Sequence, residues 1–164
     1  MRLAFFKPKT WGQPSRMPLP PLLRDLLRSG AWCQPADNRI QQTVPFLKEP
    51  VDFLLTEERM RFESSGFLAD DPRSSEWFHE FRGSVVGADR ALPWLDVDKA
   101  LFIAVNREIG ADLGIALDYR TDISDPRVVA SEWSEWNTKR QPGSGCHWLV
   151  AAPTFSAFVK MIGL

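Results

Sequence analysis

The last third of the chain alternates short apolar runs with polar turns, a pattern typical of consecutive β-strands. An apolar run at 101–105 predicts one strand. The next run alternates, and its larger apolar positions are Leu113, Ile115, Leu117 and Tyr119. The positions between them, including Asp118, are small or polar, so we expect one core face and one polar face. Two more strands are predicted at 127–133 and 146–151, with a loop at 141–145. Because the connections are too short for parallel crossovers, the pattern predicts an antiparallel meander.

Helices are predicted on both sides of this strand region. A leucine stripe at 22–30 follows two prolines and stops at Gly30. An apolar run at 51–55 precedes Thr56, a suitable N-cap for a helix with acids in its first turn. Thr154 caps a closing helix whose apolar positions at helical spacing are Phe155, Phe158, Val159 and Ile162. The aromatic residues at 76–81 suit a further helical turn.

These elements predict an α+β fold, with an antiparallel sheet of about four to six strands packed by N- and C-terminal helices. A chain of 164 residues with 44% apolar composition suits one core, so we expect a single domain over 22–164. Residues 1–21 hold five prolines and are expected to form an extended arm.

Charge is divided unevenly along the chain. Residues 1–50 hold eight Lys/Arg and three Asp/Glu, a balance of +5, while residues 51–164 hold twelve against eighteen, a balance of −6. The larger part is acidic and no Lys/Arg block occurs, so a nucleic-acid-binding role is not expected. No apolar stretch approaches the ~20 residues of a membrane helix. Two cysteines are too few for a disulfide scaffold, and the first apolar run is too short for a signal peptide, so we expect a cytoplasmic protein.

Candidate chemistry is sparse. A metal site needs three or four converging ligands, and His79, His147, Cys33 and Cys146 are the only His and Cys residues, so we expect no metal and no cofactor. The sequence Gly143-Ser144-Gly145 lacks the spacing of a nucleophilic serine motif. Acidic pairs are plentiful, but sequence proximity does not fix two acids across a cleft. We therefore expect a protein that is not an enzyme.

Three segments resemble the SUKH superfamily, which contains bacterial immunity proteins and fungal cell-wall assembly regulators of the Smi/Knr type. They are Gly110-Ala111-Asp112-Leu113-Gly114-Ile115-Ala116-Leu117-Asp118-Tyr119, then Val128-Val129 with the tryptophan-bearing segment after it, and finally Ala152-Pro153-Thr154-Phe155-Ser156-Ala157-Phe158. The resemblance covers roughly residues 92 to 164. It implies a SUKH-like fold and a non-enzymatic immunity protein that binds and neutralises a toxin encoded nearby. A cytosolic scaffold or regulator of the Smi/Knr type is the alternative, and a hydrolase using surface carboxylates is a distant third.

The charge division and the resemblance together suggest two kinds of partner contact. An acidic surface would steer a basic toxin towards the protein, and its candidate residues are Glu57, Glu58, Asp112 and Asp118. Seven tryptophans stand against one tyrosine, and tryptophan is a preferred anchor at interfaces. Trp133 and Trp136 flank the polar pair Ser134-Glu135, so they are candidate anchors, although core packing is an equally good interpretation.

Overall fold

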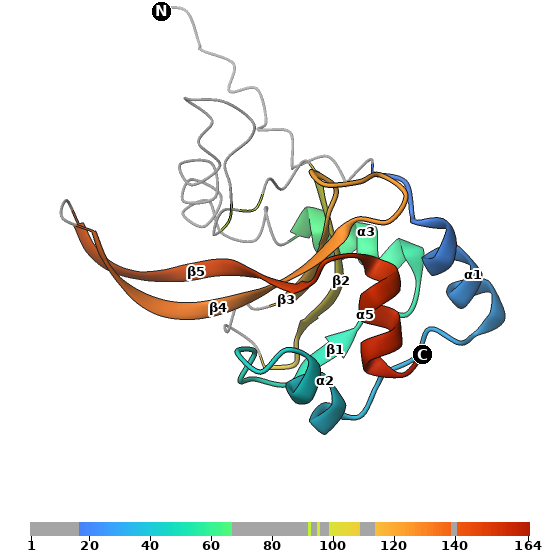
Figure 1. The fold of residues 1–164 in the computed structure, drawn as a ribbon, viewed down its shortest axis with the longest axis horizontal. Coiled ribbons are helices and arrows are strands. Elements are labelled where there is room, and N and C mark those ends of the chain that lie inside the picture. Colours follow the sequence, from blue (N-terminus) through green and yellow to red (C-terminus); the bar gives the residue numbers. More distant parts are fainter. Residues whose placement is uncertain (1–16, 67–91, 93–94, 96–98, 109–113, 139–140) are drawn as a thin grey trace, which may run out of the picture.

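The computed structural model describes residues 17–66, 92, 95, 99–108, 114–138 and 141–164. Five of their segments form one antiparallel sheet in which sequential strands are neighbours, in the order β1-β2-β3-β4-β5 (Figure 1). The strands are β1 (Val51–Phe53), β2 (Ala100–Asn106), β3 (Gly114–Asp118), β4 (Arg127–Thr138) and β5 (Gln141–Ala152). The predicted antiparallel meander is confirmed.

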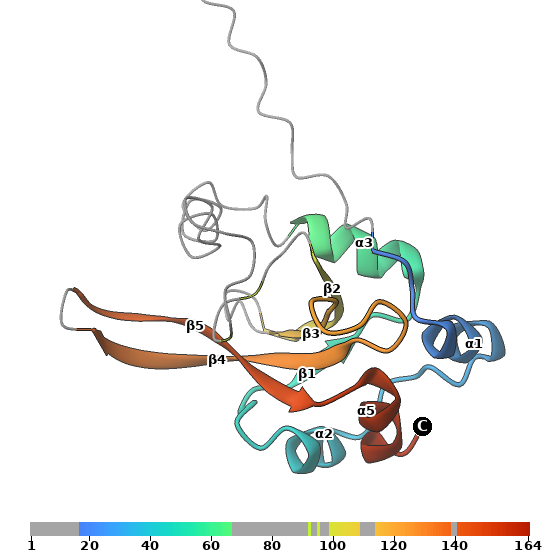
Figure 2. The ribbon, with the colours of Figure 1, turned by 45° about the horizontal axis from the view of Figure 1, so that its top comes forward.

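Helices cover both faces of the sheet, which confirms the α+β class. In the described part of the chain they are α1 (Pro21–Ser29), α2 (Asp37–Thr43), α3 (Glu57–Gly66) and α5 (Phe155–Ile162). Figure 2 shows α3 on one face, with α2 and α5 on the other. The helix α2 was not predicted, because its seven residues include only one apolar residue that becomes buried, Ile40.

Local sequence signals set the predicted helix ends. Gly30 ends α1 with a φ of 74°, a left-handed conformation that glycine adopts without steric cost. The Thr56 hydroxyl accepts a hydrogen bond of 3.1 Å from the Arg59 amide in the first turn of α3. Thr154 accepts an equivalent bond of 3.1 Å from the Ala157 amide at the start of α5. Both threonines therefore satisfy amides that have no partner inside their helix.

An aromatic cluster joins the two ends of the described chain beneath the sheet. The Trp32 ring lies 5.0 Å from the Phe53 ring and 5.8 Å from the Phe155 ring, measured between centroids. Phe53 stacks on Phe158 at 6.5 Å. The Trp32 indole nitrogen also donates to the Leu54 carbonyl at 2.9 Å, which satisfies its one polar group. These contacts hold α5 and β1 against the segment that follows α1.

The expectation that one face of the central strand β3 is polar and exposed is wrong. Every residue of β3 is buried, including Ala116 and Asp118 on the face expected to be polar. Helices lie on both faces of the sheet (Figure 2), and the Phe102 ring lies beside Gly114 on the face expected to be polar. Gly114 shows how tightly β3 fits, because a Cβ atom there would lie 2.8 Å from the Ala104 carbonyl oxygen.

The hairpin of β4 and β5 is longer than the sequence indicated. The stretch 141–145, expected to be a loop, forms the first part of β5 and pairs with β4 from Thr138↔Gln141 onward. β4 likewise continues to Thr138 rather than ending near Trp133. Cross-strand pairing thus overrides the turn preference of Pro142, Gly143 and Gly145, which an edge strand tolerates.

Several predicted features lie outside the described residues. They are most of the arm at 1–21, of which only 17–21 is described, the helical turn at 76–81 and Asp112. Within the described ranges, no helix has the length and apolar character required to cross a membrane.

Leu117→Ala tests the packing of β3. Leu117 has no exposed surface, so removing its side chain leaves a cavity between two packed layers and should lower the free energy of unfolding by roughly 2–5 kcal/mol. Urea denaturation measures the loss. Leu22→Ala on α1 is the control. Leu22 is partly exposed, so this substitution should lower the free energy of unfolding much less. Similar losses for the two variants would contradict this description of the core.

Candidate functional site

Glu57 and Glu58 lie in the first turn of α3, as predicted, and both are exposed. Glu57 already has a partner, because Arg61 one turn later donates to its carboxylate from Nη2 at 2.6 Å and from Nε at 2.8 Å. Half of the Glu57 side chain is exposed, so this pair contributes little to stability. It does offset the charge that Glu57 would offer to a basic partner.

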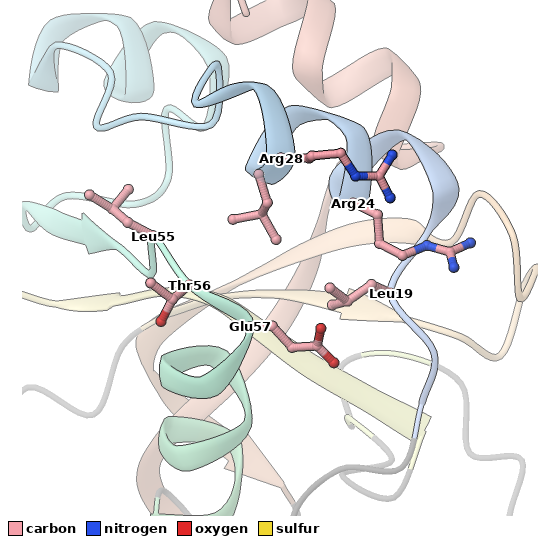
Figure 3. A pocket seen from close by; sticks show the side chains of 7 residues that line it. Leu19, Arg24, Arg28, Leu55, Thr56 and Glu57 are labelled. Carbon is pink, nitrogen blue, oxygen red and sulfur yellow. The ribbon is translucent and has the colours of Figure 1, made fainter.

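An open pocket of about 420 Å³ adjoins Glu57, between α1 and the start of α3 (Figure 3). Its apolar wall includes Leu55, which is 49% exposed. Two guanidinium side chains from α1 lie on the opposite wall. This surface therefore has mixed charge rather than an acidic character. The complete lining is Leu19, Arg24, Leu27, Arg28, Leu55, Thr56 and Glu57.

Asp118 does not lie on a binding surface. Its side chain is fully buried at the end of β3, where it accepts hydrogen bonds from two guanidinium groups. Arg120 Nη2 lies 2.8 Å and Arg127 Nη2 lies 2.7 Å from Asp118 Oδ2. Arg127 is also the cross-strand neighbour of Asp118 on β4. The carboxylate is thus used inside the protein, which corrects its expected place among exposed acids.

The pKa of Asp118 reflects two opposing effects. Burial acts to raise the pKa of the carboxyl group, since the charged form loses its hydration. The hydrogen bonds from Arg120 and Arg127 outweigh burial and hold the pKa below its ordinary value. Asp118 therefore remains ionised in the folded protein at neutral pH, with two cations around it.

Other carboxylates of the described chain also have cationic partners. Arg107 donates to Asp52 at 2.7 Å and to both oxygens of Asp37 at 3.1 Å, which ties α2 to β1. The hydrogen bond from Arg107 is the main cause that lowers the pKa of Asp37. These pairings, with that of Glu57, reduce the anionic surface that the sequence suggested. The acidic-surface hypothesis now depends mainly on Glu58 and on Asp112, which lies outside the described residues.

Trp133 and Trp136 lie on β4, beyond the part of that strand that pairs with β3. Figures 1 and 2 show the end of the β4–β5 hairpin as a two-stranded arm that extends well away from the helices. Trp133 is paired in register with Cys146, and Trp136 with Gly143. The structure therefore places both candidate anchors on one element. We call residues 132–138 and 141–147 the hairpin arm.

No third described strand supports the hairpin arm. β3 pairs with β4 only from Arg127 to Ala130, so the register of those two strands stops where the arm begins. At this point the hydroxyl of Ser131 accepts a hydrogen bond of 2.7 Å from the Gly114 amide. An isolated two-stranded hairpin is marginally stable in water. Among the described residues, the strands of the arm pair only with each other.

Metal-ligating and nucleophilic residues form no recognisable centre in the described part of the chain. No group of three or more His, Cys, Asp or Glu residues is placed to hold a metal ion there. Ser144 and Cys146 are two positions apart on β5, within the arm. Cys33 is an exposed free thiol after α1.

The sequence interpretation missed Arg120 and Arg127 as the partners of Asp118. Arg120 lies two positions after the acid, a spacing that usually places residues on the same side of a strand. Arg127 follows the turn at 121–126, and only the β3–β4 register brings it opposite the acid. A buried charged cluster was therefore not detectable from residue type alone, because Asp is usually exposed.

Comparison with known proteins gives no relative: no family model, no curated protein and no solved structure matches this chain.

Asp118→Asn tests the buried ion cluster. The amide cannot balance the two guanidinium charges, so the free energy of unfolding at pH 7 should fall by about 3 kcal/mol. Because the folded pKa lies below the unfolded value of about 3.9, the contribution of Asp118 is present above that pH and is lost as pH falls through the folded pKa. The difference between wild type and variant in urea titrations should therefore shrink below about pH 4.

Asp25→Asn is the matched control for this measurement. Asp25 pairs with Arg28 at 3.2 Å, and both side chains are mostly exposed. Such pairs contribute about 0–1 kcal/mol, so this variant should be nearly as stable as wild type. If Asp118→Asn unfolds at the same urea concentration as wild type, the ion cluster makes no net contribution to the free energy of unfolding.

Proposed function

We propose that this protein is a non-enzymatic protein-binding module, an immunity protein that binds and neutralises a toxin encoded beside it. The observation that carries the proposal is the hairpin arm, which projects two strands and two tryptophan positions from the body of the protein. The resemblance of the β3, β4 and α5 segments to SUKH proteins supplies the class of partner. Such a protein would act in the cytoplasm, before the toxin reaches its target.

The hairpin arm suits a protein partner for two reasons. A hairpin that no other described strand supports gains stability when a partner covers it. Tryptophan is also among the residues that contribute most to binding free energy when a partner excludes water from them. Contact through an aromatic arm depends little on ionic strength, whereas steering by exposed acids weakens as salt screens them. Since Asp118 is buried and Glu57 is paired, we assign the main contact to the arm.

The alternative role, a scaffold or regulator of the Smi/Knr type, would use the same arm with a different partner. Gene neighbourhood separates the two roles, because an immunity gene lies beside a toxin gene. A locus without a toxin gene next to it would exclude the immunity role and leave the scaffold role.

Trp133→Ser and Trp136→Ser test the arm as the interface. Positions 133 and 136 fall on opposite faces of a strand, so the single variants report which face makes contact. A tryptophan anchor contributes at least about 2 kcal/mol, so loss of the contacting one should weaken the affinity for the neighbouring toxin by about 30-fold or more. Isothermal titration calorimetry with catalytically inactive toxin measures the affinity.

Ile123→Ser is the matched control, because Ile123 is 61% exposed in the β3–β4 turn and lies away from the arm. It should bind the toxin as wild type does. A double Trp133→Ser/Trp136→Ser variant that folds and binds the toxin as tightly as wild type would exclude the arm. In the same assay, Glu57→Lys/Glu58→Lys should slow association only at low salt, if steering by these acids operates.

A further inference from the structure

The hairpin arm begins at two buried side chains, one on each of its strands. Ser131 on β4 and Trp148 on β5 are register partners and directly precede and follow the arm. We call these two residues the arm base. The β3–β4 register ends at Ile115↔Ala130, so among the described residues β5 is the only strand paired with β4 beyond this point. The contacts of the arm base therefore matter for how the arm is held.

Ser131 attaches β4 to the first residue of β3. Its hydroxyl accepts a hydrogen bond of 2.7 Å from the Gly114 N–H and donates one of 3.3 Å to the Gly114 carbonyl. Ser131 has no exposed surface, so water does not compete for these bonds. One side-chain oxygen thus contacts both backbone groups of the residue at which β3 begins.

Trp148 attaches β5 to the body of the protein through an aromatic contact. Its ring lies 5.5 Å from the Phe102 ring of β2, measured between centroids, with an angle of 64° between the ring planes. Edge-to-face pairs of this kind are favourable, and both residues are buried. The Phe102 N–H donates to the Ser64 hydroxyl of α3 at 2.9 Å. β5 therefore packs against a residue that is itself bonded to a helix.

The two attachments meet beside Gly114. A Cβ atom on Gly114 would lie 3.2 Å from Cδ1 of the Phe102 ring, so the missing side chain lets that ring lie next to the residue that Ser131 binds. A hairpin attached through one strand alone could rotate about that strand. Attachment of both strands at neighbouring points opposes this rotation.

We propose that Ser131 and Trp148 are positioning residues that fix the direction of the hairpin arm in the free protein. A binding element that already has its bound direction loses less conformational entropy on association, and so binds more tightly. This effect on affinity rests on the proposed function, in which the arm contacts the toxin. The fixed direction itself is a property of the free chain and is tested without a partner.

Distances between two spin labels measure the direction of the arm. One label is attached at Glu135→Cys on the arm and the other at Arg24→Cys, an exposed position on α1. Cys33→Ser and Cys146→Ser remove the two native thiols of the chain. Double electron–electron resonance then gives the distribution of distances between the labels. With the native arm base, this distribution should be single and narrow.

Ser131→Ala and Trp148→Leu should each broaden the distance distribution, because each releases one strand of the arm from the body. Circular dichroism and thermal melting verify that the variants are folded, and if one does not fold, the other decides. Leu117→Ala is the control, since it destabilises the core of β3 and keeps both attachments, so its distribution should remain narrow. A broad distribution with the native arm base, or a narrow one in the folded variants, would overturn the proposal.

Toxin affinity separates this inference from the proposed function. Both variants keep Trp133 and Trp136, so a loss of affinity reports the cost of ordering a mobile arm, which should be about tenfold in calorimetric titration with inactive toxin. If the distance distributions broaden as expected while the affinity is unchanged, the arm base does fix the arm but the arm is not the toxin contact. That result would contradict the proposed function and leave this inference standing.

Discussion

The complete burial of β3 is the constraint on which the rest of this structure depends. A strand covered on both faces must be tightly packed and fully satisfied in its polar groups. Gly114 meets the first requirement, since no side chain fits beside the Ala104 carbonyl. The Asp118 carboxylate meets the second through Arg120 and Arg127. The β3–β4 register follows from the same contact, because Arg127 lies opposite the acid it neutralises.

Several charged side chains in the described part of the chain join elements of the fold. Arg107 joins α2 to β1 through Asp37 and Asp52, and the Asp118 cluster joins β3 to β4. Buried or bridging pairs fix the relative positions of elements, and removal of one partner leaves an uncompensated charge. For Asp37, Asp52 and Asp118, an acidic count in the sequence therefore overstates the charge that a partner meets.

β1 and β5 are the outer strands of the described sheet. Gln34 takes bonding positions along β1, whereas β5 contains no Asp, Glu, Lys or Arg and forms one strand of the hairpin arm. The end of the β4–β5 hairpin extends away from the helices (Figure 1). The contact proposed for this protein therefore lies on the hairpin. The helical layers mainly hold that hairpin in position.

The sequence by itself determined the elements whose signals are local. Alternation and apolar runs gave the antiparallel meander, and Thr56, Thr154 and Gly30 marked helix ends, because a cap acts within one turn of its own helix. Tertiary structure decided what depends on distant residues. It buried Asp118 on a strand face that looked polar, since the arginines that neutralise it come from beyond the strand. It also extended β5 through Pro142 and Gly143, because pairing with β4 outweighs local turn preference.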